Sequence, residues 1–353
     1  MSSGARASRY AREHQIDWMS VVPRRYGCPM SPPAIEAVDL VKKFGASTAV
    51  DGVSFVVPPG TVLGLLGPNG AGKTTTVRMM TTLTVPTSGT ARVAGYDVRE
   101  QPDMVRRNMG LTGQVATVDE LLTGRENVRM IGGLYGIGRR DLERLGSQLL
   151  EQFSIAEAAD RPVRGYSGGM RRRLDLAVSL IASPPVLFLD EPTTGLDPRS
   201  RSDLWEMLRG LVAEGTTLLL TTQYLEEADQ LADNIVVVNH GRIIAQGTPL
   251  ELKQQAGNAS LVVTVSHATD LPAARELIGR TGTEVHVDVG ARQLTAAANG
   301  IADLTRVAGW LQERAIEVDD IGLSRPSLDD VFLSLTGHRA EGEDAQDAEE
   351  VGA

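Results

Sequence analysis

The stretch Gly67–Thr75 contains the side chains best suited to chemistry. It reads Gly-Pro-Asn-Gly-Ala-Gly-Lys-Thr-Thr and meets the spacing G-x-x-x-x-G-K-[ST]. A glycine-rich turn between a strand and a helix directs several backbone N–H groups and the positive end of the helix toward a phosphate. Lys73 would reach the β- and γ-phosphates of ATP, and the Thr74 hydroxyl would help to hold Mg²⁺. The predicted nucleotide-binding residues here are Gly67, Pro68, Asn69, Gly70, Ala71, Gly72, Lys73, Thr74 and Thr75.

The flanking residues favour this interpretation over a chance glycine turn. Thr61–Leu66 is a short apolar run of strand character, and Thr74–Leu83 has no Gly or Pro and can form a helix. A second motif has the complementary chemistry, because the apolar run Val186–Leu189 is followed by Asp190 and Glu191. A buried strand would deliver Asp190 to the Mg²⁺ shell, and Glu191 could polarise the attacking water. Alone, the two acids could be solvated residues at a strand end; together with the glycine-rich turn they predict ATP hydrolysis.

A third motif, Tyr166–Met170, stands between these two and precedes three arginines. Ser167 could cap the following helix, with Gly168 and Gly169 exposing N–H groups at its positive end. Taken alone, an ordinary helix cap explains these residues. Beside the phosphate site at Gly67–Thr75, they form a second anion site. One phosphate group cannot contact both sites of the same chain unless the two sites are close together. The simplest arrangement that uses both sites is a dimer in which two copies face each other and each copy caps the ATP bound to the other.

Residues 34–256 resemble an ATP-binding cassette (ABC) ATPase. Tyr166–Met170 is similar to the family's signature sequence LSGGQ, with Tyr and Met replacing its ends. The resemblance implies that Gln114 senses Mg²⁺ and the membrane partner, that Asp197 in Gly195-Leu196-Asp197 communicates across a dimer, and that Phe44 stacks on adenine. The alternative is that Phe44 is an aromatic residue of the core. The implied fold is an α/β P-loop NTPase with a RecA-like core, an antiparallel β-subdomain and a helical signature subdomain.

The chain departs from the ABC pattern after the strand predicted at Thr217–Thr221. The family normally has a switch histidine there, whereas this sequence has Gln223. A glutamine can hydrogen-bond a γ-phosphate or a water but cannot titrate near neutral pH. His240 does not replace it, because Asn239-His240-Gly241 is typical of a tight turn between strands. We therefore expect Glu191 to be the base and Gln223 a positioning group.

Three further stretches are similar to the daunorubicin/doxorubicin-resistance ATP-binding subunits of ABC exporters. They are Tyr166–Arg173, Thr222–Asp229 and Arg325–Phe332, and Gln in place of His belongs to this pattern. The resemblance covers about residues 34–336. It implies a homodimer of ATP-binding subunits, bound at the cytoplasmic face of the membrane to a separate transmembrane permease that exports a hydrophobic drug. Val115–Asn127 would transmit motion to the permease, or would be a plain surface loop.

Other functions remain as alternatives. An exporter of lipid or of another polyketide, or an importer, would use the same ATPase. Soluble ABC ATPases of DNA repair or translation usually need two cassettes in one chain, zinc cysteines or a long coiled coil, and none of these occurs in the sequence. The formal charge of −10 gives no electrostatic case for nucleic-acid binding. The single cysteine, Cys28, excludes internal disulfides and any cysteine-based metal site.

The order of the predicted elements indicates several parts. Residues 1–33 are predicted to be a disordered extension, which could instead touch anionic lipid or precede a true start at Met30. Residues 34–257 alternate strands with helices, which predicts a mostly parallel sheet with the site at the carboxyl ends of its strands. Residues 258–336 follow the order βαββαβ and then a helix, which suggests a small ferredoxin-like α+β domain. Residues 337–353 form an acidic, disordered tail. No apolar run approaches the ~18–20 residues that span a bilayer, so membrane work requires a partner.

Overall fold

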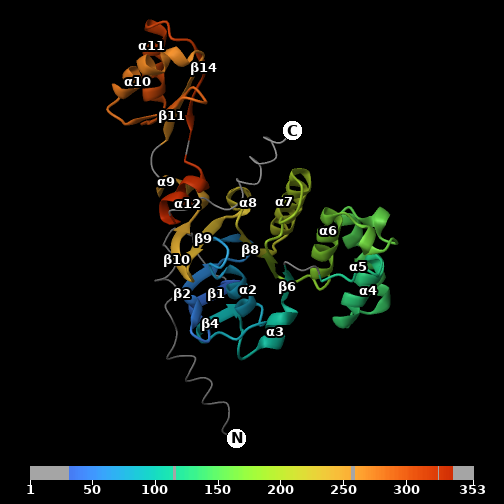
Figure 1. The fold of residues 1–353 in the computed structure, drawn as a ribbon. Helices are drawn as coiled ribbons and strands as arrows, with labels where there is room; N and C mark the ends of the chain where they lie inside the picture. The colour runs from blue at the N-terminus through green and yellow to red at the C-terminus, as the bar shows by residue number, and fades with distance from the viewer. Residues whose placement is uncertain (1–31, 114–116, 256–258, 325, 337–353) are drawn as a thin grey trace.

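The structure is a computed structural model that describes residues 32–113, 117–255, 259–324 and 326–336. The expectations for residues 1–31, Gln114 and residues 337–353 lie outside this described part. Figure 1 shows a larger body, which contains the predicted cassette, and a smaller one formed by the later strands and helices.

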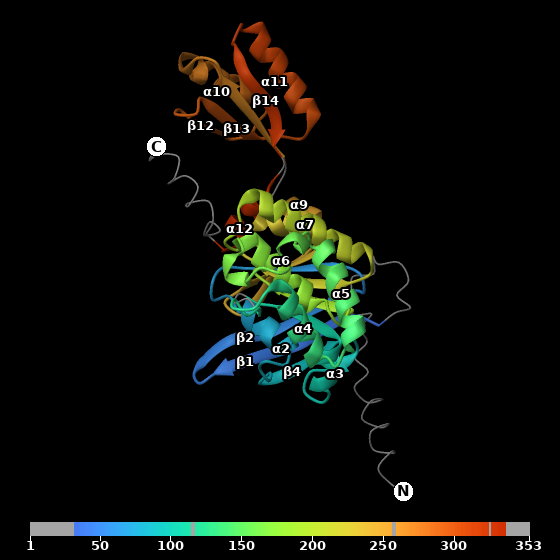
Figure 2. The same cartoon turned by 90° about the vertical axis from the view of Figure 1, so that its right-hand side faces the viewer.

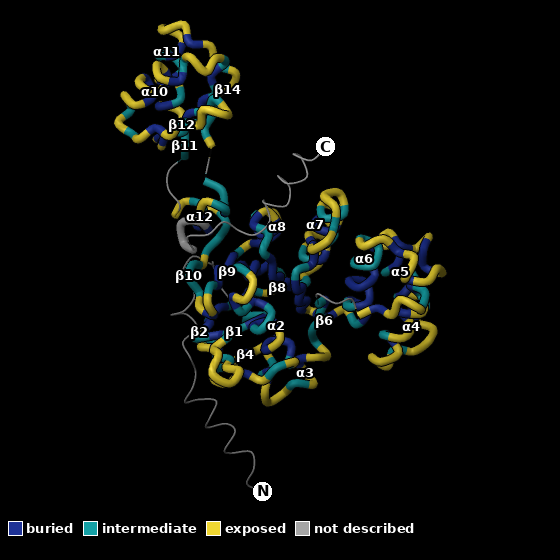
Figure 3. Tube along the Cα trace, viewed as in Figure 1, coloured by how far each residue is buried: buried dark blue, intermediate teal, exposed yellow. Residues whose placement is uncertain are grey.

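The centre of the larger body is a six-stranded sheet. Its strand order is β10 (Arg242–Gly247), β9 (Asn234–Asn239), β3 (Val62–Leu66), β8 (Thr217–Thr222), β7 (Val186–Asp190) and β6 (Met109–Thr112). All neighbours are parallel except the β9–β10 hairpin. Every residue of β3, β7 and β8 is buried, as Figure 3 shows, because helices or strands cover both faces of the sheet. The predicted mostly parallel sheet is confirmed.

An antiparallel sheet covers one face of this core. Its order is β2 (Ser47–Val57), β1 (Ile35–Phe44), β4 (Ser88–Val93) and β5 (Tyr96–Asp97). Helix α2 (Lys73–Met80) shares one apolar cluster with residues of both sheets, since Val77, Met79 and Met80 are buried there. The helix was expected to reach Leu83. It ends at Met80 because Thr82 takes a left-handed conformation with φ 63°.

Helices form the opposite side of the larger body (Figure 2). Helices α6 (Gly168–Ser179), α7 (Pro198–Ala213) and α8 (Leu225–Leu231) contribute to a second apolar cluster with the other face of the central sheet. Helices α4 (Gly124–Leu134) and α5 (Arg139–Gln152) pack on each other and on α6, which gives the predicted helical subdomain. The remaining helical segments are α3 (Pro102–Arg107), α9 (Pro249–Gln255) and the 3₁₀ turns Ala156–Ala158, Val163–Gly165 and Ala268–Asp270.

The smaller body has the ferredoxin-like arrangement expected from the sequence. Its elements are β11 (Ser260–Val265), α10 (Leu271–Gly279), β12 (Val285–Asp288), β13 (Gln293–Ala297), α11 (Ile301–Glu313) and β14 (Val318–Ser324). The four strands pair antiparallel in the order β12-β13-β11-β14. Both helices share a separate apolar cluster with this sheet.

Helix α12 (Leu328–Thr336) does not pack with this smaller body. Its residues Leu328, Val331 and Phe332 are buried in the apolar cluster of the cassette, and α12 contacts α9 and α8. The predicted accessory domain, residues 258–336, included this helix because it follows the other elements of that domain in the chain. The ferredoxin-like unit is thus inserted in the chain between two helices that both belong to the larger body, α9 before it and α12 after it (Figure 1).

The position of α12 predicts which body a core substitution destabilises. Phe332→Ala should lower the free energy of unfolding of the cassette by about 3 to 5 kcal/mol, because it removes a buried aromatic ring. Trp205 in α7 reports on the cassette and Trp310 in α11 on the ferredoxin-like unit, so single-tryptophan chains can follow the urea unfolding of each. Leu311→Ala, in the core of the smaller unit, is the matched control. A shift confined to the Trp310 signal in Phe332→Ala would contradict the packing.

Candidate functional site

The loop from Gly67 to Lys73 is wound tightly against its neighbours. A Cβ atom at Gly67 would lie 2.2 Å from the carbonyl oxygen of Val238, and one at Gly72 would lie 2.5 Å from that of Ala49. Gly72 also has φ 106°, which a side chain rarely tolerates. Both glycines are therefore required by this path of the backbone. The loop leads directly from β3 into the first turn of α2, as the sequence predicted.

Lys73 points its ammonium group back into this loop. The residue is 4% exposed, and Nζ donates hydrogen bonds to the carbonyl oxygens of Gly67 and Pro68 at 2.5 and 3.1 Å. The cation thus lies beside the backbone turn and the helix N-terminus. This combination favours a bound phosphate group.

The second motif meets the first at the carboxyl ends of the strands. Strand β8 separates β3 from β7, and Asp190 at the end of β7 is 5% exposed. Its Oδ1 accepts hydrogen bonds from the hydroxyls of Thr74, at 3.2 Å, and of Thr221. The hydroxyl of Thr74 and the carboxylate of Asp190 form a pair of hard oxygen ligands. Mg²⁺ typically binds one or two such protein groups together with phosphate oxygens.

Protein side chains alone do not complete a metal site in the part of the chain that the structure describes. Within those residues there is no group of three His, Cys, Asp or Glu side chains placed to hold a metal ion. A cation between Thr74 and Asp190 would need oxygen atoms from a nucleotide. The donor set therefore fits Mg²⁺ that arrives with ATP.

Glu191 has an unusual backbone conformation. Its φ is 50°, in the left-handed region, which costs a residue with a side chain about 1 to 3 kcal/mol. The N–H group of Glu191 donates to both the carbonyl and the hydroxyl oxygen of Thr221, each at 3.1 Å. Strand β8 thus stabilises the turn that carries the carboxylate. Such strain concentrates at functional sites.

The signature residues lie at the start of α6. Ser167 caps this helix by accepting a hydrogen bond from the Met170 N–H at 3.2 Å. A Cβ atom on Gly169 would lie 2.9 Å from Ser200 Oγ, so the first turns of α6 and α7 are in close contact. Asp197 caps α7 through the Ser200 N–H at 2.8 Å, and this hydrogen bonding lowers the pKa of Asp197. The structure therefore brings Ser167, Gly168 and Gly169 together with Asp197.

Within one copy, Ser167 acts as the ordinary helix cap that the sequence left open as an alternative. Figures 1 and 2 both show α6 apart from α2, so the two candidate anion sites of one chain are separate. Phe44 is 54% exposed at the end of β1, which excludes the alternative of a core aromatic. Its ring lies 4.9 Å from Lys42 Nζ and is available for stacking.

Gln223 follows β8 directly and precedes α8. Its Oε1 atom is buried and has no hydrogen-bond partner among the described residues. A buried acceptor without a partner costs free energy, and a ligand or water could satisfy it. His240 and Gly241 form the turn of the β9–β10 hairpin with φ 46° and 77°, as predicted. Gln114 lies outside the described residues.

Sequence reasoning missed Glu227 on α8. This residue is 0% exposed, and burial raises the pKa of its carboxyl to about 7. Its Oε1 accepts a hydrogen bond from Trp205 Nε1 at 3.3 Å. The signal in the sequence is its place in α8, because Glu227 lies on the same buried side of the helix as Ala228 and Leu231. It also missed Arg172 and Asp175, whose partners lie far along the chain.

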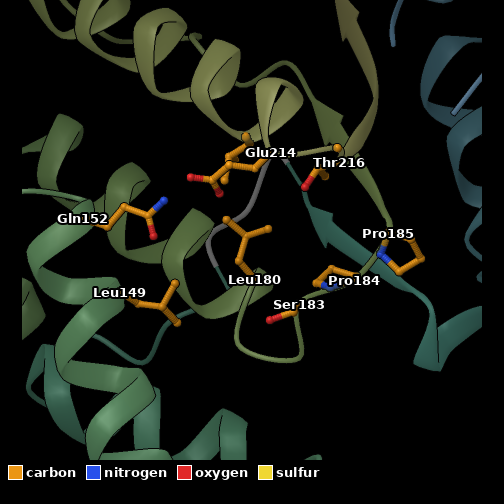
Figure 4. Close-up of a pocket in the computed structure, with 10 residues that line it drawn as sticks. Leu149, Gln152, Leu180, Ser183, Pro184, Pro185, Glu214 and Thr216 are labelled. Carbon is orange, nitrogen blue, oxygen red and sulfur yellow. The ribbon is translucent and has the colours of Figure 1, made fainter. Parts of the chain in front are cut away.

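A cavity of about 320 Å³ lies elsewhere and does not belong to this site. Its lining includes Pro184, Pro185 and Thr216, which precede β7 and β8, together with Leu180 and Glu214 (Figure 4). These residues are at the amino ends of the strands. The candidate nucleotide-binding residues follow the carboxyl ends.

The chain is similar in sequence and in fold to known proteins. Residues 50–194 match the family model described as ABC transporter. The chain is 52% identical over 317 residues to the Daunorubicin resistance ATP-binding protein DrrA2 of Streptomyces coeruleorubidus, covering 89% of this chain and 98% of that protein. It is 48% identical over 318 residues to the Daunorubicin/doxorubicin resistance ATP-binding protein DrrA of Streptomyces peucetius, covering 90% and 96%. A solved ATP-binding subunit of an ABC transporter is 30% identical, with a TM-score of 0.58, covering 63% of this chain and 92% of that chain.

The raised pKa of Glu227 predicts a pH-dependent stability. The folded protein favours the protonated carboxyl of Glu227. Its contribution to the free energy of unfolding is therefore complete below pH 4.5, the pKa in the unfolded chain, and is lost as the pH rises through about 7, the pKa in the folded chain. Glu227→Gln keeps the neutral form at every pH. Between pH 5.5 and pH 8 the unsubstituted chain should therefore lose about 2 kcal/mol of unfolding free energy that the Glu227→Gln chain keeps.

Urea unfolding of both chains at the two pH values measures this difference. Glu226→Gln, on the exposed side of the same helix, is the control and should leave the pH dependence unchanged. An equal pH dependence in Glu227→Gln and the unsubstituted chain would show that the buried carboxyl does not titrate in this range.

Proposed function

The chain belongs to the daunorubicin/doxorubicin-resistance ATP-binding proteins among the ABC transporter ATPases, and we propose that it powers an exporter. In this proposal, ATP hydrolysis by a dimer of this chain drives efflux of a hydrophobic, anthracycline-like drug through a separate permease. The observation that carries the ATPase role is that Lys73 and Thr74, which follow β3, lie at the same edge of the sheet as Asp190 of β7, with Thr74 Oγ1 3.2 Å from Asp190 Oδ1.

Each predicted residue has a role in binding ATP·Mg²⁺. The N–H groups of Gly67–Thr75 and the ammonium group of Lys73 would hold the phosphates, and Thr74, Asp190 and Gln114 would hold Mg²⁺. Phe44, exposed at the end of β1, would stack on adenine. Glu191 would act as general base toward the attacking water, which the buried amide of Gln223 would help to position.

The separation of the two anion sites supports a head-to-tail dimer. Ser167, Gly168 and Gly169 of one copy would cap the γ-phosphate of ATP bound to the other copy, beside Asp197 at the interface. ATP favours the closed dimer because only that state satisfies both anion sites. Binding and release of ATP would then close and open the pair.

Work at a membrane is assigned to a partner. Among the residues that the structure describes, no helix has both the length and the apolar character to cross a bilayer. The segment Val115–Asn127 would meet the permease at the cytoplasmic face. Leu121, on this segment, is 76% exposed and offers apolar surface for that contact. Residues 34–257 would be the ATP-binding domain and 258–336 an accessory domain, with α12 fixed to the cassette.

The first test follows the dimer. Glu191→Gln should bind ATP·Mg²⁺ and remain dimeric, because binding is retained while hydrolysis falls by about 10²- to 10⁴-fold. Light scattering after size exclusion, with and without ATP·Mg²⁺, measures this. Lys73→Ala is the comparison; it should stay monomeric and should abolish ATP-dependent drug export by cells that also contain the permease. Unchanged export by Lys73→Ala, or a monomeric Glu191→Gln chain with ATP bound, would refute the proposal.

The second test separates Gln223 from Glu191. Gln223→Ala should lower kcat by only about 3- to 10-fold, the cost of one neutral hydrogen bond. Steady-state phosphate release, measured for both substitutions in parallel, gives the ratio. If Gln223→Ala stopped turnover as completely as Glu191→Gln, Gln223 would share the essential chemistry.

A further inference from the structure

Arg172 lies between the signature helix and the loops of the nucleotide site. It is on the second turn of α6, and its side chain is only 12% exposed. Its guanidinium donates through Nε to Pro192 O at 2.8 Å and through Nη1 to Gly113 O at 2.8 Å. A longer contact joins Nη2 to Asp190 O at 3.4 Å. The carbonyls of Asp190 and Pro192 stand on either side of Glu191.

The neighbouring Asp175 binds the other end of the same segment. It lies one turn after Arg172, is fully buried, and its Oδ1 accepts the N–H and the hydroxyl of Thr117, each at 2.7 Å. Asp175 Oδ2 is 3.6 Å from Arg172 Nη1. Arg172 therefore holds Gly113, and Asp175 holds Thr117.

Only an arginine suits this position. A buried cation is costly unless it is paired and hydrogen-bonded, and here three carbonyls and one carboxylate surround it. The planar guanidinium can reach several acceptors in fixed directions, whereas the ammonium of a lysine is a point charge on a flexible stem. The conformation of Glu191 is left-handed, and the carbonyls on both sides of it are held by Arg172, in addition to the hydrogen bonds of the Glu191 N–H to Thr221.

We infer that Arg172 is a positioning residue for ATP hydrolysis. It holds the turn Asp190–Pro192, which carries Glu191, in a fixed place relative to helix α6 and to Gly113. A displacement at either of these elements therefore moves the carboxylate. The inference rests on the proposed role of Glu191 as the base.

The principal test is Arg172→Lys in the purified full-length chain. It should lower kcat by about 10- to 100-fold, because small misplacements of a catalytic group have effects of this size. The affinity for a fluorescent ATP analogue with Mg²⁺ should stay within about twofold, since Arg172 touches none of the phosphate-binding residues. Arg173→Lys is the matched control: it is the next residue of α6, but its partner is the carboxylate of Asp203, at 2.6 Å, which a lysine can also pair. Its kcat should not change.

Thr117→Val provides a second route that does not depend on how the buried site tolerates lysine. Thr117 is exposed, so this chain should fold, and it loses one hydrogen bond to Asp175. Its kcat should fall by about 2- to 10-fold at unchanged ATP affinity. Because Arg172 and Thr117 both contact Asp175, their effects should not add, and adding Thr117→Val to Arg172→Lys should lower kcat no further.

A purely structural role would give a different pattern. Thermal unfolding and nucleotide binding would then decline together, while kcat per bound nucleotide stayed at its original value, and that result would overturn the inference. The inference would also be overturned if kcat were unchanged in both Arg172→Lys and Thr117→Val while Glu191→Gln was inactive. A fully active Glu191→Gln would instead refute the proposed function itself.

Discussion

The site depends on the register of three parallel strands. In this register Thr221 of β8 lies opposite Leu65 of β3 on one side and Asp190 of β7 on the other. Thr221 therefore stands between the two motifs, and its side chain or backbone contacts both Asp190 and Glu191. Because these strands are buried on both faces, sliding one of them would disturb packing above and below the sheet at once. The apolar packing of the core thus fixes the distance between Thr74 and Asp190.

The helical side of the cassette is connected to this sheet by polar groups as well as by apolar packing. Asp175 and Glu227 are fully buried and the side chain of Arg172 is only 12% exposed, so each would be costly without its partners. Replacing such groups by apolar residues often preserves stability, so stability alone does not explain them. Their partners are backbone groups and side chains next to catalytic or switch positions. These contacts therefore hold the loops that carry Glu191 and Gln223 in place.

Local patterns in the sequence predicted much of the fold. The glycine spacing, the apolar run before Asp190 and the alternation of strands with helices need only neighbouring residues, and each was found where expected. The order βαββαβ likewise predicted the ferredoxin-like sheet. Strand β6 is too short to show a pattern of its own. It forms because Met109–Thr112 can pair with β7, which comes much later in the chain.

Other features depended on contacts that no local pattern contains. The exposure of Phe44 follows from how β1 ends, and the burial of Glu227 follows from the packing of α8 against Trp205. The partners of Arg172 come from two segments, one before and one after α6 in the chain. A sequence of three consecutive arginines gives no sign that the middle one donates to the carbonyls of Gly113, Asp190 and Pro192, which lie far along the chain.

Helix α12 extends this reasoning to the ferredoxin-like unit. Its apolar residues lie in the cassette core, so the unit is attached to the larger body through a helix at each end. Withdrawing α12 from the cassette would expose Phe332 and its neighbours to water, which opposes that movement. Helix α12 contacts α8, the helix that begins after Gln223 and carries Glu227. Because interiors are close-packed, a shift of α12 changes the surroundings of α8. The accessory unit and the switch position are therefore joined through two packed helices, although they are far apart in the sequence.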